Sequence, residues 1–246
     1  MAMTVMELFQ SGSLQEAIQA LGEEVRNAPL DTKRRTFLFE LLCFAGEYDR
    51  AEKHLNILAD ASQAANLGSL LYRSAIHAER IRQQMFLDHT YPISKATNKF
   101  CGTHNGQPFS SFHDADERIG DCLEVFVAGS YTWIALEQIA SIEVPKPKRL
   151  RDLLWAPAIV TSTPAFRSME LGEVLLPVLS PLSWRHTDDS VRLGRSTIWE
   201  EGGERQSAFV PFGQKMFLID GQEVPLLELG RLEQSVGAGE ERVASA

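Results

Sequence analysis

Cysteine, histidine and aspartate residues gather between positions 101 and 122, where their types could support metal chemistry. Cys101 and His104 form one compact pair, while His113 and Cys122 follow as single residues. Thiolate and imidazole groups suit zinc, but structural zinc sites usually draw on two compact pairs. Because only one pair is compact here, we interpret the stretch as a loop with unrelated polar residues and expect no metal site.

Asp114 and Asp116 are spaced like the first two ligands of a calcium-binding loop. Arg118 stands where a further ligand oxygen is needed, and Gly120 comes one position too late for the sharp turn of such a loop. We therefore favour a capping box over a calcium site. In that arrangement Asp114 accepts from backbone amides of a short helix, and Glu117 reaches back to it.

Nucleophilic catalysis and nucleotide binding have no support in the glycine and serine pattern. Gly129-Ser130 lacks the second glycine of a nucleophile elbow, and no histidine lies in the last 60 residues. Gly194 and Gly202-Gly203 form no phosphate-binding fingerprint, because no glycine trio follows a strand and opens a helix. We predict a protein that is not an enzyme and that holds no cofactor.

One basic run interrupts an otherwise acidic sequence, and it could dock an acidic partner surface. We favour a solvated connecting segment instead, anchored to a sheet by the apolar residues that follow it. The basic residues are Lys146, Lys148, Arg149 and Arg151, and the apolar ones are Leu153, Leu154 and Trp155.

Composition narrows the classes of partner. The 246 residues carry a formal charge of −9, which repels the phosphates of nucleic acid. Three cysteines are too few for a disulfide framework and fit a reducing compartment, so we expect a cytoplasmic protein. The first residues show no export signal, and no stretch approaches the roughly 18 apolar residues that a membrane span needs, so we expect no membrane insertion.

A short internal repeat indicates the elements at the N-terminal end. Its period of 34 residues is that of tetratricopeptide (TPR) repeats, in which a glycine ends one helix and a small alanine lets two helices approach closely. Pro29 falls where such repeats place the proline that stops the second helix. The matched pairs are Gly12 with Gly46, Leu14 with Tyr48, Ala17 with Ala51, and Leu21 with Leu55.

The repeat and the apolar spacing predict five helices, at about 4–10, 13–27, 32–45, 48–60 and 62–87. The last of these carries a stripe that we expect to be buried, formed by Leu67, Leu70, Leu71, Ser74, Ala75, Ala78, Ile81 and Met85. Such arrays usually need about three units for stability, because one unit cannot cover its own apolar face. With only two units present, we expect the last helix to dock on a second domain.

The sequence divides into a TPR-like helical domain at 1–88, a junction of loop residues at 89–112, a strand-rich domain at 113–234, and a tail at 235–246 that we expect to be disordered. Asp220-Gly221 is a strong hairpin signal. Pro177 and Pro225 would break a central ladder, so their strands should lie at edges or carry bulges. The expected strands cover 123–127, 131–136, 140–144, 158–162, 173–179, 196–200, 215–219 and 223–229. We predict an α+β fold, in which the TPR-like array packs on an antiparallel strand-rich domain.

The second half resembles the ImpE, TagJ or SciE-type accessory proteins of bacterial type VI secretion. The resemblance lies in residues 114–126, 129–134, 150–158 and 193–199, with further agreement at 213–215 and 225–227. One departure is Leu179, which stands where the family usually has an arginine. The residues that match the family motifs are Asp114, Asp116, Arg118, Asp152, Trp155, Pro157, Arg195 and Trp199.

The resemblance implies a cytoplasmic adaptor that binds the small subunit of the contractile sheath through that subunit's N-terminal helix. It also implies a link to the ClpV-type AAA+ ATPase that disassembles the sheath. Two alternatives stay open. One is a metal-dependent hydrolase that uses His104, His113, Asp114 and Asp116, and the other is a generic TPR peptide-binding scaffold.

A groove in a helical repeat can receive an amphipathic helix. If the usual concave face is used, the repeat register predicts partner-binding residues on two equivalent helices. These are Lys33, Thr36 and Glu40 on one helix, and Ser74 and His77 on the next.

Overall fold

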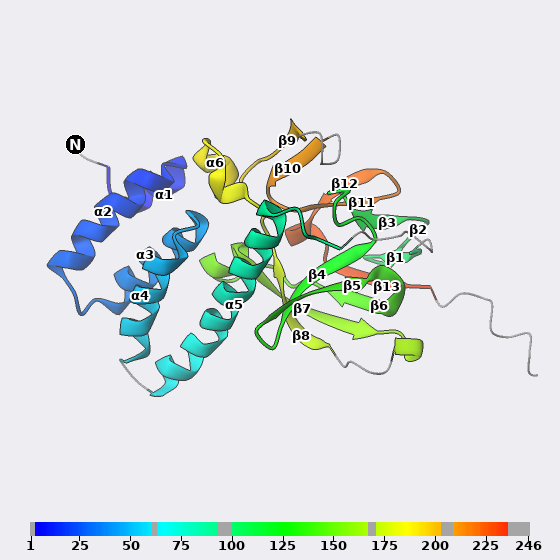
Figure 1. The fold of residues 1–246 in the computed structure, drawn as a ribbon, viewed down its shortest axis with the longest axis horizontal. Coiled ribbons are helices and arrows are strands. Elements are labelled where there is room, and N and C mark those ends of the chain that lie inside the picture. The colour runs from blue at the N-terminus through cyan, green and yellow to red at the C-terminus, as the bar shows by residue number, and fades with distance from the viewer. Residues whose placement is uncertain (1–2, 61–62, 93–99, 167–170, 203–208, 236–246) are drawn as a thin grey trace, which may run out of the picture.

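The computed structural model describes residues 3–60, 63–92, 100–166, 171–202 and 209–235. Five helices come first, and each begins and ends within one residue of its expected position (Figure 1). They are α1 (Val5–Ser11), α2 (Leu14–Asn27), α3 (Thr32–Phe44), α4 (Tyr48–Ala59) and α5 (Gln63–Leu87). These helices confirm the helical part of the predicted α+β fold, while their assignment to the TPR class stays a prediction.

Local chemistry fixes the helix ends. Thr4 and Glu7 form a capping box at the start of α1, and Asp31 caps α3 by accepting from the backbone of Arg34. Gly46, one of the repeated glycines, has a φ of 71°, and a Cβ there would lie 2.6 Å from the Trp184 ring. Glycine at this position therefore serves both the helix end and the close approach of the C-terminal half.

Strands are the main regular structure of the C-terminal half, and every strand pair is antiparallel. The main sheet has eight strands in the order β2-β1-β13-β6-β7-β8-β4-β5, and smaller sheets have the orders β12-β11-β3 and β10-β9. The strands are β1 (Gly102–His104), β2 (Gln107–Phe109), β3 (Phe112–Asp114), β4 (Cys122–Val127), β5 (Ser130–Ala135), β6 (Ile139–Glu143), β7 (Trp155–Ser162), β8 (Gly172–Pro177), β9 (Thr197–Glu201), β10 (Phe209–Gly213), β11 (Met216–Ile219), β12 (Gln222–Pro225) and β13 (Arg231–Gln234). A short helix, α6 (Asp189–Arg192), precedes β9.

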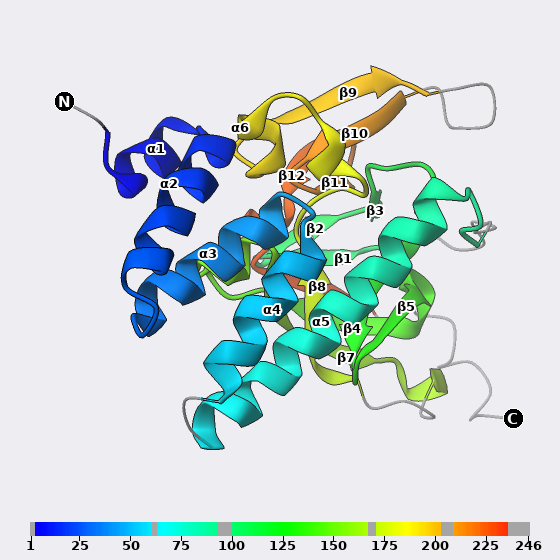
Figure 2. The same cartoon turned by 60° about the vertical axis from the view of Figure 1, so that its left-hand side comes forward.

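Two large apolar cores hold the molecule together. One lies within the strand-rich half and joins the main sheet to the β12-β11-β3 sheet through residues such as Phe112 and Phe217. The other contains helix residues together with Phe126, Leu154 and Trp155 of the C-terminal half. Helix α5 lies along the sheet (Figure 2). The helical array therefore docks on the strand-rich half, as the small number of repeat units predicts.

The junction at 89–112 differs from the prediction of loop structure. Its described part contains β1 and β2, joined by Asn105 with a φ of 50° and Gly106 with a φ of 83°. An Asn-Gly pair favours the two-residue hairpin turn because both positions need positive φ. Asp220 and Gly221 form the expected hairpin in the same way. The tail from residue 236 onward lies outside the described residues.

The prediction that Pro177 and Pro225 lie in edge strands is right for one proline and wrong for the other. Pro225 ends β12, an edge strand, as predicted. Pro177 ends β8, which lies between β7 and β4, so the prediction of an edge strand is wrong there. The proline is tolerated because it occupies the last position of the strand, and the pairing of β8 with β4 is confined to Leu175 and Phe126.

The expected buried stripe of α5 is only partly buried. Ala75 and Ala78 are buried, but Leu67 is 72% exposed and Leu71 is 52% exposed. The sheet instead meets a polar side of the helix that includes Arg82. Within the described parts of the chain, we find no helix both long and apolar enough to span a membrane.

Candidate functional site

A buried ionic cluster lies between α5 and the strand-rich half. Glu124 on β4 accepts from Arg82 on α5 at 2.7 Å, from Nε to Oε1. The Lys215 ammonium lies 2.6 Å from the second carboxylate oxygen of Glu124 and also pairs with Asp114. Glu79 completes the cluster by pairing with Arg82 at 3.1 Å. All five side chains are almost fully buried.

Electrostatics keep Glu124 and Lys215 of this cluster ionised. Burial opposes the ionisation of Glu124, but the Arg82 and Lys215 cations outweigh this effect and hold the pKa of that carboxyl well below its usual range. Burial likewise opposes the charge of Lys215, but Asp114 and Glu124 outweigh it and raise the pKa of the ammonium. Burial raises the pKa of Asp114 to about 7 although the Lys215 cation opposes the rise, so its charge is only partly present at neutral pH. Glu124, Arg82 and Lys215 are therefore mutually compensating charges rather than a free acid and base.

Aromatic donors satisfy the remaining acceptors of the cluster. The Tyr131 hydroxyl donates to Glu124 Oε1 at 2.5 Å, and Trp133 Nε1 donates to the Tyr131 oxygen. Trp155 Nε1 on β7 donates to Glu79 Oε2 at 3.0 Å. A buried polar network that is satisfied in this way fixes how helix and sheet dock. This geometry suits a structural role, in which the network holds α5 against the sheet.

The Asp114–Gly120 segment contains no short helix, so the predicted capping box is wrong. Asp114 Oδ1 does accept from a backbone amide, that of Asp116 at 2.9 Å, but this contact forms a tight turn after β3. Asp116 in turn binds the guanidinium of Arg118, whose Nε donates at 2.8 Å. Arg118 also lies over the Phe86 ring of α5, with its Cζ 4.8 Å from the ring centroid.

The residues considered for metal binding do not converge. His104 Nε2 lies 2.8 Å from the carbonyl oxygen of Leu229, and Cys122 packs in a small apolar cluster with Phe86. His113 lies on β3, paired with a residue of β11. Across residues 3–60, 63–92, 100–166, 171–202 and 209–235, no three His, Cys, Asp or Glu side chains are grouped so that they could hold a metal ion.

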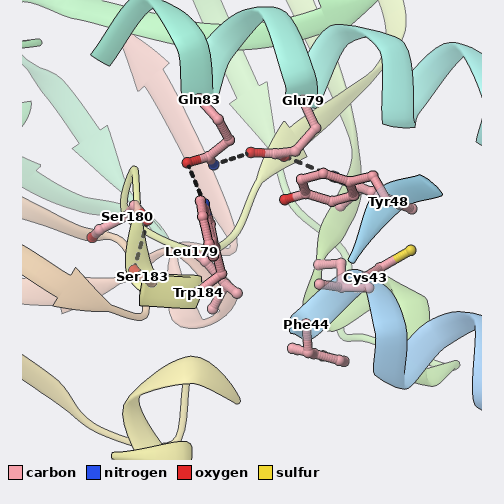
Figure 3. A pocket seen from close by; sticks show the side chains of 11 residues that line it. Cys43, Phe44, Tyr48, Glu79, Gln83, Leu179, Ser180, Ser183 and Trp184 are labelled. Atoms are coloured by element: carbon pink, nitrogen blue, oxygen red, sulfur yellow. Dashed lines mark hydrogen bonds between the residues drawn. The ribbon is translucent and has the colours of Figure 1, made fainter. Parts of the chain in front are cut away.

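A small cavity next to the ionic cluster shows how closely the two halves fit (Figure 3). Gln83 of α5 receives hydrogen bonds from Trp184 Nε1 at 3.2 Å and from the Leu182 amide at 2.8 Å. Tyr48 and Cys43 close the opposite side. The cavity holds about 20 Å³, which is room for roughly one water molecule and too little for a substrate.

A larger groove opens on the helical array, and we refer to it as the array groove. It has a volume of about 600 Å³. Helices α3, α4 and α5 form most of its wall, and the segment before β7 contributes two arginines. Its lining residues are Thr32, Thr36, Phe39, Leu55, Leu58, Ala65, Gly68, Ser69, Leu71, Tyr72, Arg149 and Arg151.

A second hollow adjoins the array groove. It has a volume of about 300 Å³ and lies between α5 and the strands β4, β7 and β8. Leu71 lines both the array groove and this hollow, and Pro157 and Leu175 line only the hollow. The two depressions therefore meet at a leucine whose side chain is half exposed.

The structure separates the five residues predicted from the repeat register. Thr36 lines the array groove and Ser74 lines the second hollow. Lys33 and His77 are exposed but line neither depression. Glu40 is buried, and this burial raises the pKa of its carboxyl to about 7 although the Arg151 cation opposes the rise.

Sequence reasoning missed the main features of the array groove. Leu58, Leu71 and Tyr72 supply accessible apolar and aromatic surface, while Phe39 and Leu55 are buried beneath it. The Arg151 guanidinium lies over the Tyr72 ring, with Cζ 4.5 Å from the centroid. The basic run is therefore partly packed against the helical array through Arg151, and the prediction of a solvated segment fits its exposed residues Lys146, Lys148 and Arg149. The basic run itself was the available signal, because it could have been assigned to docking.

Several residues that carry the family resemblance join the two halves. Trp155 binds Glu79 as described, and Arg195 donates to the carbonyls of Phe9 and Gln10 at the end of α1. Asp152 accepts from the backbone amides of residues 148 and 149 and so shapes the basic segment.

Other family positions have local roles. Trp199 lies on β9, opposite residue 211 of β10. The backbone carbonyl of Leu179, the residue at which the resemblance predicts a departure, accepts from Arg82 at 3.0 Å. This contact with the ionic cluster comes from the backbone and not from the side chain at position 179.

Comparisons with known proteins agree with this architecture. The family model described as "ImpE protein" matches residues 106–233. A Pseudomonas aeruginosa protein described as "Type VI secretion system accessory component TagJ" is 30% identical over 266 aligned residues, covering 94% of this chain and 91% of the relative.

A solved structure shares the fold. The crystal structure of protein VPA1032 from Vibrio parahaemolyticus has a TM-score of 0.82 at 21% identity, and the match covers 94% of this chain and 97% of that one. Such low identity supports the fold alone. The family model and the relative together show the family, and the chain belongs to the ImpE family, which includes the type VI secretion accessory component TagJ.

Proposed function

We propose that this protein is a non-enzymatic cytoplasmic adaptor of a type VI secretion system, and that its array groove holds the N-terminal helix of the small sheath subunit. The observation that carries the proposal is the array groove, an open depression of about 600 Å³ with apolar and aromatic lining. The family relationship with an accessory component of that system supports the pathway.

The shape and chemistry of the array groove suit a helix better than a small metabolite. An amphipathic helix buries anchors at positions i, i+3, i+4 and i+7, and needs an elongated apolar surface. Leu58 and Tyr72 supply half-buried apolar area, and the exposed Leu71 extends it toward the second hollow. Leu67 and Leu70 lie exposed on α5, the same helix as Leu71, and add apolar area that the described residues leave uncovered.

The geometry gives no comparable support to the hydrolase alternative. Asp114 and Asp116 are buried in ion pairs with Lys215 and Arg118. His104 is bound to the backbone carbonyl of Leu229. It lies on β1 of the main sheet, whereas Asp114 lies on β3 of a smaller sheet. An elemental analysis of the purified protein provides the test, because a stoichiometric bound metal would restore the enzyme proposal.

The proposal also includes a link to the ClpV-type ATPase, so that the adaptor connects the sheath subunit with the machine that disassembles the sheath. Its support is the family resemblance. A generic peptide-binding scaffold differs in one measurable respect, because it would bind unrelated amphipathic peptides as tightly as the sheath helix.

The first prediction concerns Leu71, which is 52% exposed and shared by both depressions. Leu71→Asp places a carboxylate on an apolar contact surface, and we expect it to weaken binding of a labelled sheath-helix peptide at least tenfold, which corresponds to about 1.4 kcal/mol. Fluorescence anisotropy provides the measurement.

Ile57→Asp is the matched control for Leu71→Asp. Ile57 is 50% exposed on the neighbouring α4 and does not line the array groove, so the same change should alter affinity less than about twofold. Equal effects of the two substitutions, or none from Leu71→Asp, would contradict the placement of the binding site.

A further inference from the structure

The charges of the array groove indicate which kind of helix it accepts. Among the described residues that line it, the charged ones are Arg149 and Arg151. Both come from the segment before β7 and not from the helical array. The charged lining of the array groove is therefore wholly basic, although the chain carries a net charge of −9.

Neither arginine is neutralised by an ion pair within the described part of the chain. Most other arginines there have carboxylate partners, as in the pairs of Arg34 with Glu24 and Arg80 with Glu52. Arg151 instead stacks on the Tyr72 ring, while Arg149 is exposed. Stacking on an aromatic ring orients a guanidinium and leaves its N–H groups available for carboxylates.

The nearby acids do not cancel this charge. Asp152 directs its Oδ2 to the backbone amides of residues 148 and 149, at 2.8 and 3.0 Å. Glu40 is buried, and its pKa of about 7 leaves it only partly ionised at neutral pH. The exposed lysines Lys146 and Lys148 add further positive charge beside the array groove.

We propose that the array groove selects an amphipathic partner helix that carries acidic side chains where it meets Arg149 and Arg151. This inference rests on the proposed function and specifies the chemistry of its partner. The apolar stripe of the helix lies against the aromatic wall, and carboxylates on one flank bind the two guanidinium groups. Arginine suits this role because its planar fork binds a carboxylate through two parallel hydrogen bonds.

Charge reversal tests the inference. The probe is a labelled synthetic peptide of the sheath subunit's N-terminal helix, titrated into the full-length protein. Arg149→Glu should weaken binding about tenfold at low salt, and Arg149→Gln should have a smaller effect in the same direction. Raising the ionic strength tenfold should weaken the wild type and should barely affect Arg149→Glu.

Lys146→Glu is the matched control, since it makes the same change in charge within the same basic run but does not line the array groove. It should weaken binding less than about threefold, because exposed charges farther from the contact are screened. A peptide whose acidic residues are changed to lysine should bind Arg149→Glu more tightly than it binds the wild type. Urea unfolding checks that each variant is folded.

The outcomes separate this inference from the proposed function. One outcome is that Leu71→Asp weakens peptide binding while wild type, Arg149→Glu and Arg149→Gln bind the peptide equally. In that case the proposed acidic flank of the partner helix is wrong, and the array groove remains the binding site. Tight binding of a natural sheath helix that lacks acidic residues would lead to the same conclusion. A peptide that does not bind the wild-type protein contradicts both proposals.

Discussion

At the scale of residues, the ionic cluster explains how polar side chains can be buried between helix and sheet. Arg82 contacts Glu79, Glu124 and the Leu179 carbonyl, so its charge is fully compensated. A satisfied buried network is specific for one arrangement, because a sheet shifted along α5 would leave a charge without its partner.

The cluster yields a prediction for stability. Arg82→Met removes one partner and leaves Glu124 buried with less compensation, so we expect the free energy of unfolding to fall by about 3–5 kcal/mol. Urea denaturation followed by circular dichroism measures the change. Arg80→Met, two residues away, removes partly exposed pairs with Asp49 and Glu52 and should cost less than about 1 kcal/mol. Similar losses for both variants would contradict the role of the cluster.

The raised pKa of the Glu40 carboxyl predicts that the stability of the protein depends on pH. Its pKa is raised from 4.5 to about 7 by burial, so the folded chain holds this proton more tightly than the unfolded chain. The contribution of Glu40 is therefore present below pH 4.5 and is lost as the pH rises through about 7.

Glu40→Gln tests this contribution, because it keeps the size of the side chain and removes the titration. Relative to wild type, the variant should gain on the order of 2 kcal/mol in the free energy of unfolding between pH 5 and pH 8. Urea unfolding across that range provides the measurement. A difference between the two proteins that stays constant with pH would contradict the assigned shift.

At the scale of elements, sequence reasoning was accurate where the signal is local. The 34-residue repeat and the apolar spacing predict the five N-terminal helices. The sequence does not predict the four-residue helix α6 or the strands β1, β2, β3, β10 and β13, which have three to five residues each and too little length for a period of two to show. The Asn105-Gly106 pair is the local signal that marks the β1–β2 hairpin, because both residues adopt positive φ.

The candidate site was less predictable for a physical reason. The repeat register led to Thr36 but could not show that Glu40 is buried or that residues 149–151 close the array groove. Arg82 and Glu124 are 42 residues apart, and no local pattern links them. Contacts between the helical array and the strand-rich half depend on tertiary packing, whereas helix boundaries depend on neighbours in the sequence.

The attachment of α1 gives a prediction at this scale. Arg195 donates to Gln10 and Phe9 carbonyls at 2.7 and 2.5 Å, and its Cζ lies 4.9 Å from the Phe9 ring centroid. Arg195→Ala removes these contacts, so we expect faster amide hydrogen exchange in α1 with little change in the main sheet. Hydrogen-exchange mass spectrometry measures it.

Arg185→Ala is the control for Arg195→Ala, since Arg185 is exposed and its replacement should leave exchange in α1 unchanged. Unaltered protection of α1 in the Arg195→Ala protein would show that the helix is held by apolar packing alone.

At the scale of the whole molecule, the helical array and the strand-rich half act as one body. They share an apolar core and the buried ionic cluster, and the basic segment of one half completes the groove of the other. A partner in the array groove therefore contacts both halves at once. Trp155 and Arg195 hold this arrangement together from the strand-rich side.

The central claim is that the array groove is the surface that contacts the sheath subunit. The most direct test places a photo-crosslinking benzophenone amino acid at Leu71, or at the equally exposed Met6 on α1, in cells that assemble the secretion system. We predict a crosslink to the small sheath subunit from position 71 and none from position 6. A crosslink from position 6 alone, or none from position 71 while the sheath subunit co-purifies, would contradict the account.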